Sequence, residues 1–148
     1  METLNIYNVD AALSDDLLEG VRVHAGFSSS HRGDMRNAIN LNCELSTHPE
    51  STFYARVAGE SMRDVGVGDG DLLVVDKSID FRDGDMAVCI LNGEFLVRFI
   101  ERHSDHLQLV AAHPEVSPII VGEADEFEVW GVVTYTIHKM RGWASRGK

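Results

Sequence analysis

The sequence has few positive charges and few cysteines. Its 13 lysines and arginines stand against 24 aspartates and glutamates, a formal net charge of -11, and only three of the cations are lysines. A phosphate backbone is bound by clustered cations, so this balance argues against a chain that grips nucleic acid through its whole surface. The two cysteines, Cys43 and Cys89, form no close pair in the sequence, which favours a reduced, cytoplasmic protein over a disulfide scaffold.

Long hydrophobic runs are also missing. No stretch approaches the roughly 18 apolar residues of a membrane span, and the N-terminus lacks the basic flank and apolar run of a secretory signal. We therefore expect neither a membrane anchor nor secretion. The 148 residues are 44% hydrophobic and 25% charged, which is ordinary for one folded domain with an additional arm.

The pattern of residues changes near residue 50. Residues 1–50 contain scattered apolar residues and short polar runs, and we expect an extended N-terminal arm that must dock on something. Ser14 and Asn42 are candidate caps of short helical turns in this arm, because their side chains can accept from backbone N–H groups. Residues 51–148 form the second part, and there the pattern becomes that of β-strands.

Short β-strand segments separated by glycine-rich turns make up the second part. Asn92-Gly93 lies between two of them and predicts a two-residue hairpin turn, because both residues tolerate positive φ. Gly131 interrupts the last segment and predicts a bulge or bend. This spacing favours a mainly β fold, a rolled antiparallel sheet or barrel. The predicted strands cover residues 53–58, 71–76, 85–91, 94–101, 106–111, 118–121 and 127–138.

Two positions are candidates for chemistry, each with an ordinary alternative. Ser61 follows Gly59-Glu60, where a small residue allows a tight turn, but position 63 is arginine and the Gly-x-Ser-x-Gly elbow is incomplete. Ser61 by itself is therefore typical of a turn serine. Alternation along residues 94–101 places Arg98 between Leu96 and Ile100 on one strand face. A cation there either snorkels to solvent or points into a site.

Histidines and acids in the second part do not form a metal motif. His103 and His106 are three residues apart, and metal binding would need further ligands, so a solvated turn is expected. Closely spaced acids lack the twelve-residue calcium loop with its terminal glutamate, and we interpret them as turn and strand-edge residues. No metal and no cofactor are predicted. The acids are Asp64, Asp69, Asp71, Asp76, Asp80, Asp83 and Asp85.

Six stretches, taken together and in order, are shared with one enzyme family. They are Ala58-Gly59-Glu60-Ser61-Met62, Val67-Gly68-Asp69-Gly70-Asp71-Leu72-Leu73-Val74-Val75-Asp76, Asp83-Gly84-Asp85, Gly93-Glu94-Phe95, Ser117-Pro118-Ile119 and Val129-Trp130-Gly131-Val132-Val133. The set resembles the LexA/UmuD family of self-cleaving S24 serine peptidases, over residues from about 20 to 141. The resemblance implies a LexA C-terminal-type peptidase domain with an N-terminal arm.

The resemblance also implies roles for particular residues. Ser61 matches the family nucleophile, and the backbone N–H groups of Ser61 and Met62 are candidates to hold the developing oxyanion. The family cleaves its own arm between a small residue and glycine, and Ala25-Gly26 matches that bond. The family's base is a lysine on the strand after the Gly-Glu-Phe turn. That position is Arg98 here.

The arginine makes the identity of the base an open question. A guanidinium keeps its charge at physiological pH and offers no acceptor lone pair, and loss of a base typically costs a factor on the order of 10⁴ to 10⁶. Three interpretations stay open. Self-cleavage is absent or very slow, which we favour; or Arg98, helped by burial or high pH, still assists Ser61; or another group, such as His24 beside the bond, is the base.

The resemblance implies two functions of different classes. In the first, the protein is an SOS-response autopeptidase that removes residues 1–25, with a RecA-type recombinase filament as co-protease. In the second, it is a UmuD-like accessory subunit that forms a homodimer and engages a Y-family translesion DNA polymerase, whether or not it cleaves itself.

Two further alternatives fit the sequence less well. A phage-type repressor fragment would need a DNA-binding helical domain, for which 50 residues leave little room, so no sequence-specific DNA binding is expected. A signal-peptidase relative would need a membrane anchor, and the sequence has no apolar run of that length.

Overall fold

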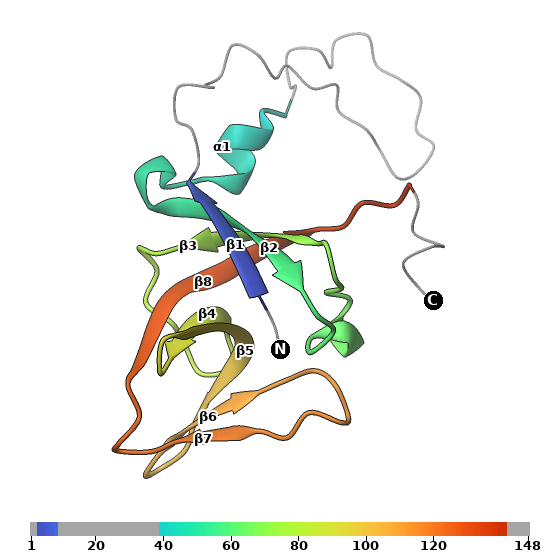
Figure 1. Ribbon diagram of the computed structural model, residues 1–148. Helices are drawn as coiled ribbons and strands as arrows, with labels where there is room; N and C mark the ends of the chain where they lie inside the picture. Colours follow the sequence, from blue (N-terminus) through green and yellow to red (C-terminus); the bar gives the residue numbers. More distant parts are fainter. Residues whose placement is uncertain (1–2, 9–38, 142–148) are drawn as a thin grey trace, which may run out of the picture.

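The computed structural model describes residues 3–8 and 39–141 (Figure 1). Eight strands form one sheet in the order β1-β2-β3-β8-β4-β5-β6-β7. Every neighbouring pair is antiparallel. This confirms the mainly β, antiparallel architecture predicted from the sequence. None of the helices in these two ranges is long and apolar enough to cross a membrane.

The strands agree closely with the predicted segments. They are β1 (Thr3–Asn8), β2 (Thr52–Ala58), β3 (Leu72–Asp76), β4 (Met86–Leu91), β5 (Glu94–Arg102), β6 (Leu107–Val110), β7 (Ile119–Val121) and β8 (Phe127–Ile137). Three short helices complete the described elements, namely α1 (Leu41–Leu45) and the 3-10 helices η2 (Pro49–Ser51) and η3 (Arg63–Val65). The strand β1, which the sequence does not predict, pairs with β2 along its whole length.

The long strand β8 joins the two halves of the sheet. Its first part pairs with β4 and its second part with β3, and Figure 1 shows it bending between them. The register shifts twice, so that Trp130 and Thr134 are each an extra residue without an opposite partner. Such bulges bend a strand and increase its twist. The predicted irregularity at Gly131 is thus confirmed, one residue from the first bulge.

The hairpin between β4 and β5 has the predicted two-residue turn. Asn92 has φ of 50° and Gly93 has φ of 84°. Two successive positive φ angles define a type I′ turn, whose twist matches that of antiparallel strands. The turn fixes the register that opposes Ala87 to Arg98.

Two apolar clusters lie on the two faces of β5. The first includes Val97, with Phe95 and Phe99 packed against it. The second includes Ile100, with Leu96 packed against it. This confirms the predicted alternation, and it places Arg98 on the side of the second cluster, which also contains Ala87, Cys89 and Leu109.

The helix cap predicted at Asn42 is wrong by two residues. Asn40 is the N-cap of α1, and its side-chain oxygen accepts from the backbone N–H groups of Asn42 and Cys43. Both asparagines suit a cap by residue type, and the position of the first helical turn decides between them. The other candidate cap, Ser14, and the bond Ala25-Gly26 lie outside the described residues, as does His24. The division into an arm and a β domain stays a prediction.

Gly131 is required by the close approach of β3 to β8. A Cβ atom at this position would lie 2.6 Å from Val75 Cγ1 and 3.3 Å from the Asp76 carbonyl oxygen. We expect Gly131→Ala to lower the free energy of unfolding by about 1–3 kcal/mol, because overpacking must move the strand. Urea unfolding followed by circular dichroism measures the change.

Gly122→Ala is the matched control for that substitution. Its Cβ would meet only Asp125 Oδ2 at 3.5 Å, an ordinary contact. An equal loss of stability in both variants would contradict the steric explanation.

Candidate active site

Ser61 lies in a tight loop between β2 and β3. The loop begins at Gly59, whose φ of 108° is accessible to few other residues. Ser61 is 8% exposed and the following Met62 is 2% exposed, with the methionine side chain in the first apolar cluster. Burial of Met62 anchors the loop in the core and leaves little freedom to the serine beside it.

Three hydrogen bonds to other segments hold this loop. The Gly59 N–H donates to Asp69 Oδ1 at 2.9 Å. The Ala112 N–H donates to the Ser61 carbonyl at 2.8 Å, and the Asp64 N–H donates to the Ala112 carbonyl at 2.8 Å. Backbone bonds of this kind position a side chain without depending on its own rotamer.

The structure brings Arg98 and Ser61 together across 37 residues of sequence. Arg98 Nη1 donates to Ser61 Oγ at 3.0 Å and to the Val97 carbonyl at 2.8 Å. Arg98 is only 6% exposed. The alternative in which this cation snorkels to solvent is therefore wrong, because its head group is buried with the serine hydroxyl.

The guanidinium is an unusual partner for a serine that is predicted to act as a nucleophile. An arginine only donates, so it uses a lone pair of the hydroxyl oxygen and cannot take up the hydroxyl proton. The contact orients Ser61 Oγ and leaves the oxygen less basic than a contact with a neutral amine would. Arg98 therefore lies where the resemblance predicts the base of a serine–lysine dyad. It donates a hydrogen bond to Ser61 Oγ, whereas a neutral lysine amine would accept one from the hydroxyl.

Neither lysine among the described residues, Lys77 or Lys139, lies beside Ser61 as a base would. Lys77 places Nζ 4.6 Å from the ring centre of Trp130 and 5.8 Å from that of Phe53, which are cation–π distances. Lys139 is exposed beyond the end of β8. The roles of Ser61 and Met62 in holding an oxyanion stay predictions.

A match to a protein-family model decides the family. The model, described as peptidase S24-like, matches residues 16–134. The chain belongs to the S24 peptidase family. Among its relatives, this S24 chain is 36% identical to the Protein ImpA of Escherichia coli over 121 residues, which is 81% of each chain. It is 32% identical to the Protein MucA of Escherichia coli over 124 residues, 78% of this chain and 80% of the relative.

A repressor is also among the relatives of this S24 protein. The LexA repressor of Bordetella avium is 38% identical over 134 residues, which is 86% of this chain but 62% of the repressor. The relatives ImpA, MucA and SamA place the chain with the UmuD-like S24 proteins of SOS mutagenesis. Its class is that of serine autopeptidases.

The other polar candidates have structural partners. The rings of His103 and His106 stack with centres 4.8 Å apart, and His106 Nδ1 donates to Asp105 Oδ1 at 2.7 Å. Asp85 accepts from the Arg82 N–H in the turn before β4, and Asp83 accepts from the Arg102 N–H at the end of β5. These acids act in turns and at strand edges, as predicted. Within residues 39–141, no group of three or more potential ligands is arranged to hold a metal.

Sequence reasoning missed the supports of the serine loop. The sequence indicates only a turn residue at Asp69, and nothing in it pairs Ala112 with Ser61. The one signal for Asp69 is its place between Gly68 and Gly70, where flanking glycines free the backbone to turn. The link to Ala112 depends on the path of the β6–β7 connection, which leaves no local pattern.

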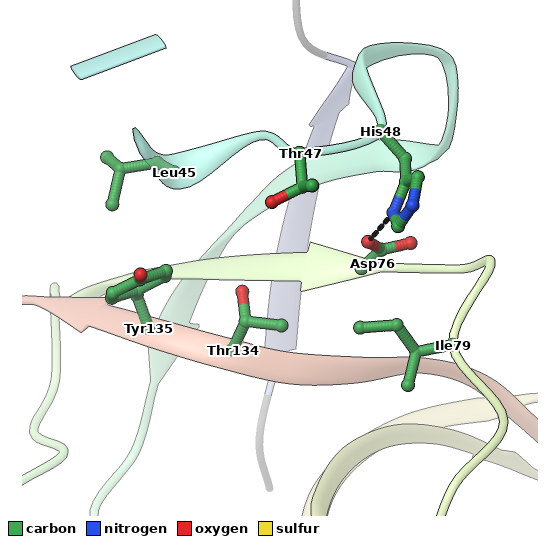
Figure 2. A pocket seen from close by; sticks show the side chains of 7 residues that line it. All are labelled: Leu45, Thr47, His48, Asp76, Ile79, Thr134 and Tyr135. Atoms are coloured by element: carbon green, nitrogen blue, oxygen red, sulfur yellow. Dashed lines mark hydrogen bonds and ion pairs between the residues drawn. The ribbon is translucent and has the colours of Figure 1, made fainter. Parts of the chain in front are cut away.

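A second polar cluster lies at the far end of β3 (Figure 2). His48 Nδ1 donates to Asp76 Oδ2 at 2.8 Å, beside a cavity of about 370 Å³. Burial alone would raise the pKa of Asp76, but hydrogen bonds from Ser78 and His48 outweigh it and hold the pKa below its ordinary value of 3.8. Figure 2 shows Leu45, Thr47, Ile79, Thr134 and Tyr135 around the same cavity.

The lowered pKa of Asp76 makes its contribution to stability depend on pH. A carboxyl whose folded pKa lies below its unfolded value stabilises the fold above the unfolded pKa, and this is lost as pH falls through the folded pKa. We expect Asp76→Asn to lower the free energy of unfolding by about 1 kcal/mol at pH 7. The difference from the unmodified protein should shrink below pH 3.8. Urea unfolding at pH 7 and pH 3 measures both, and a difference that grows toward acid would contradict the assignment.

The two cysteines should differ sharply in reactivity. Cys89 is fully buried, and burial raises its thiol pKa to about 12 although the charge of Arg98 acts in the opposite direction. Cys43 is exposed. Because the thiolate is the reactive form, we expect iodoacetamide at pH 8 to alkylate Cys43 in the native protein and both cysteines after denaturation. Peptide mass spectrometry locates the label, and native labelling of Cys89 would contradict the buried site.

Proposed function

We propose that this protein is an accessory subunit of a Y-family translesion DNA polymerase, in the manner implied for UmuD-like proteins, and that it works as a homodimer. It contains an S24 peptidase site with Ser61 as nucleophile and Ala25-Gly26 as the scissile bond. Arg98 stands at the family's lysine position and makes self-cleavage very slow. The supporting observation is the 3.0 Å contact from Arg98 Nη1 to Ser61 Oγ.

The direction of that hydrogen bond explains why self-cleavage is expected to be slow. Attack on the Ala25 carbonyl forms a bond from Ser61 Oγ to carbon and requires a group that takes the Oγ proton. A neutral lysine amine takes this proton and later gives it to the Gly26 nitrogen as the carbon–nitrogen bond breaks; water then releases the acyl group. A guanidinium already holds its full set of protons, so the first transfer has no acceptor.

The geometry favours a regulated binding module over a fast autopeptidase. The uncleaved form, which keeps residues 1–25, would therefore persist for longer than in a relative that has lysine at this position. A RecA-type filament would act as co-protease by stabilising the docked arm, and the arm state would control which surface meets the polymerase.

Restoring lysine tests the peptidase site. We expect Arg98→Lys to convert the chain to a species lacking residues 1–25 during incubation at alkaline pH or with a recombinase filament. The unmodified protein should be cut about 10⁴-fold or more slowly, as for loss of a base. Intact-mass spectrometry measures both species over time.

One control variant and two contrary outcomes make the result specific. Ser61→Ala in the Arg98→Lys background should abolish the cleaved species, whereas partner binding should persist. Cleavage of the unmodified protein at a comparable rate would show that another base operates, and His24→Ala would then identify it. Failure of the lysine variant to cleave under every condition would overturn the assignment of this site.

A further inference from the structure

A buried carboxylate lies at the start of β3, close to the serine loop. Asp71 is 0% exposed. Its Oδ1 accepts from His138 Nδ1 at 2.6 Å, and its Oδ2 accepts from the Gly68 N–H at 2.8 Å. A buried charge needs such partners, and removing one of them leaves an uncompensated charge. His138 follows the last residue of β8, so the pair fastens the end of β8 to the segment before β3.

That segment in turn brackets Ser61 from both sides. We call residues 67–71 the bracing loop. On one side Asp69 Oδ1 accepts from the Gly59 N–H at 2.9 Å. On the other side the Val67 N–H donates to the Met62 carbonyl at 3.3 Å. Val67 and Met62 are both 2% exposed and share the first apolar cluster.

The bracing loop is also hydrogen-bonded to β2. The Gly70 N–H donates to the Val57 carbonyl at 2.8 Å, and the Val57 N–H donates to the Asp71 carbonyl at 2.9 Å. The loop is five residues long and bonded twice to β2, so Asp71, Asp69 and Val67 lie on one short, hydrogen-bonded segment. The contacts therefore form a continuous path from His138 to both neighbours of Ser61.

We propose that His138 is a positioning residue for Ser61, acting through Asp71 and the bracing loop. The proposal rests on the proposed role of Ser61 as nucleophile. His138 touches no reacting atom; it holds Asp71, Asp71 holds Gly68, and the loop sets the backbone on each side of the serine. The side chain of His138 is 26% exposed. A change in its surroundings at the end of β8 would therefore alter its hydrogen bond to Asp71 and, through the bracing loop, the position of Ser61.

A matched pair at the other end of β3 gives the control. His48 Nδ1 donates to Asp76 Oδ2 at 2.8 Å, and Asp76 is 5% exposed. This pair has the same residue types and a similarly buried acid, and it lies at the opposite end of β3, but none of its hydrogen bonds reaches the serine loop. A purely structural effect of losing a histidine–aspartate pair should appear equally in both.

The experiment measures amide hydrogen exchange by NMR in the full chain. The reporters are the amides of Gly59 and Val67, with amides of β4 as the reference for global unfolding. We expect His138→Ala to speed exchange of both reporters about tenfold relative to the reference, as for a lost hydrogen bond to a charged group. His48→Ala should leave the reporters unchanged relative to that reference, and His138→Lys, which supplies a side-chain N–H donor again, should return them toward the original rates.

Each result decides the proposal. Unchanged reporters in His138→Ala, equal effects of the two alanine variants, or failure of lysine to restore protection would each overturn it. Where His138→Ala does not fold, Asp69→Ala tests the next link, because this exposed residue is the acceptor for Gly59; reporters unchanged at Gly59 would overturn the proposal.

Cleavage gives a second readout. In the Arg98→Lys background we expect His138→Ala to slow cleavage about tenfold, the same loss of loop order that exchange reports. Cleavage of that double variant at the rate of Arg98→Lys alone would overturn the positioning role. If Arg98→Lys is itself uncut, the proposed function fails, while the exchange result still decides whether His138 holds the loop.

Discussion

The shared strand β8 is the constraint on which the site depends. It is hydrogen-bonded to β4 along one part and to β3 along the other, with bulges at Trp130 and Thr134. Because β3 follows the serine loop and β4 pairs with β5, this strand sets the distance between Ser61 and Arg98. The close contact of Gly131 with Val75 belongs to the same constraint. Sheet geometry therefore brings the two segments together, and the hydrogen bonds of the serine loop hold Ser61 within that frame.

The buried arginine fits this frame because one of its acceptors comes from the sheet and one from the serine loop. Nη1 donates to the Val97 carbonyl and to Ser61 Oγ, and strand alternation places Arg98 on the face of β5 that carries the second apolar cluster, which includes Cys89 and Ala87. Lysine and arginine are both long and suit the same strand position. They differ in whether they can accept a proton, so one strand position can hold either of two side chains with different acid–base chemistry.

Much of the fold could be predicted from the sequence, because its signals are local. The turn at Asn92-Gly93, the irregularity at Gly131 and the alternation of Phe95, Val97 and Phe99 each follow from residue type and period. Ser61 and Arg98 as a pair came from the resemblance to a family, since nothing local joins residues so far apart. The cap at Asn40, the strand β1 and the hydrogen bond from Ala112 to Ser61 depend on tertiary placement and left no periodic signal.

The two histidine–aspartate pairs show how one strand serves two purposes. Both pairs fasten an end of β3, and both bury a carboxylate under a partly exposed imidazole. Only the pair of Asp71 continues into hydrogen bonds that reach the residues beside Ser61. Similar local chemistry is therefore connected differently, because the second oxygen of Asp71 accepts from the Gly68 N–H and that of Asp76 accepts from Ser78. An active-site loop that is held mainly by backbone bonds is sensitive to the segment that makes them, even when that segment never meets the substrate.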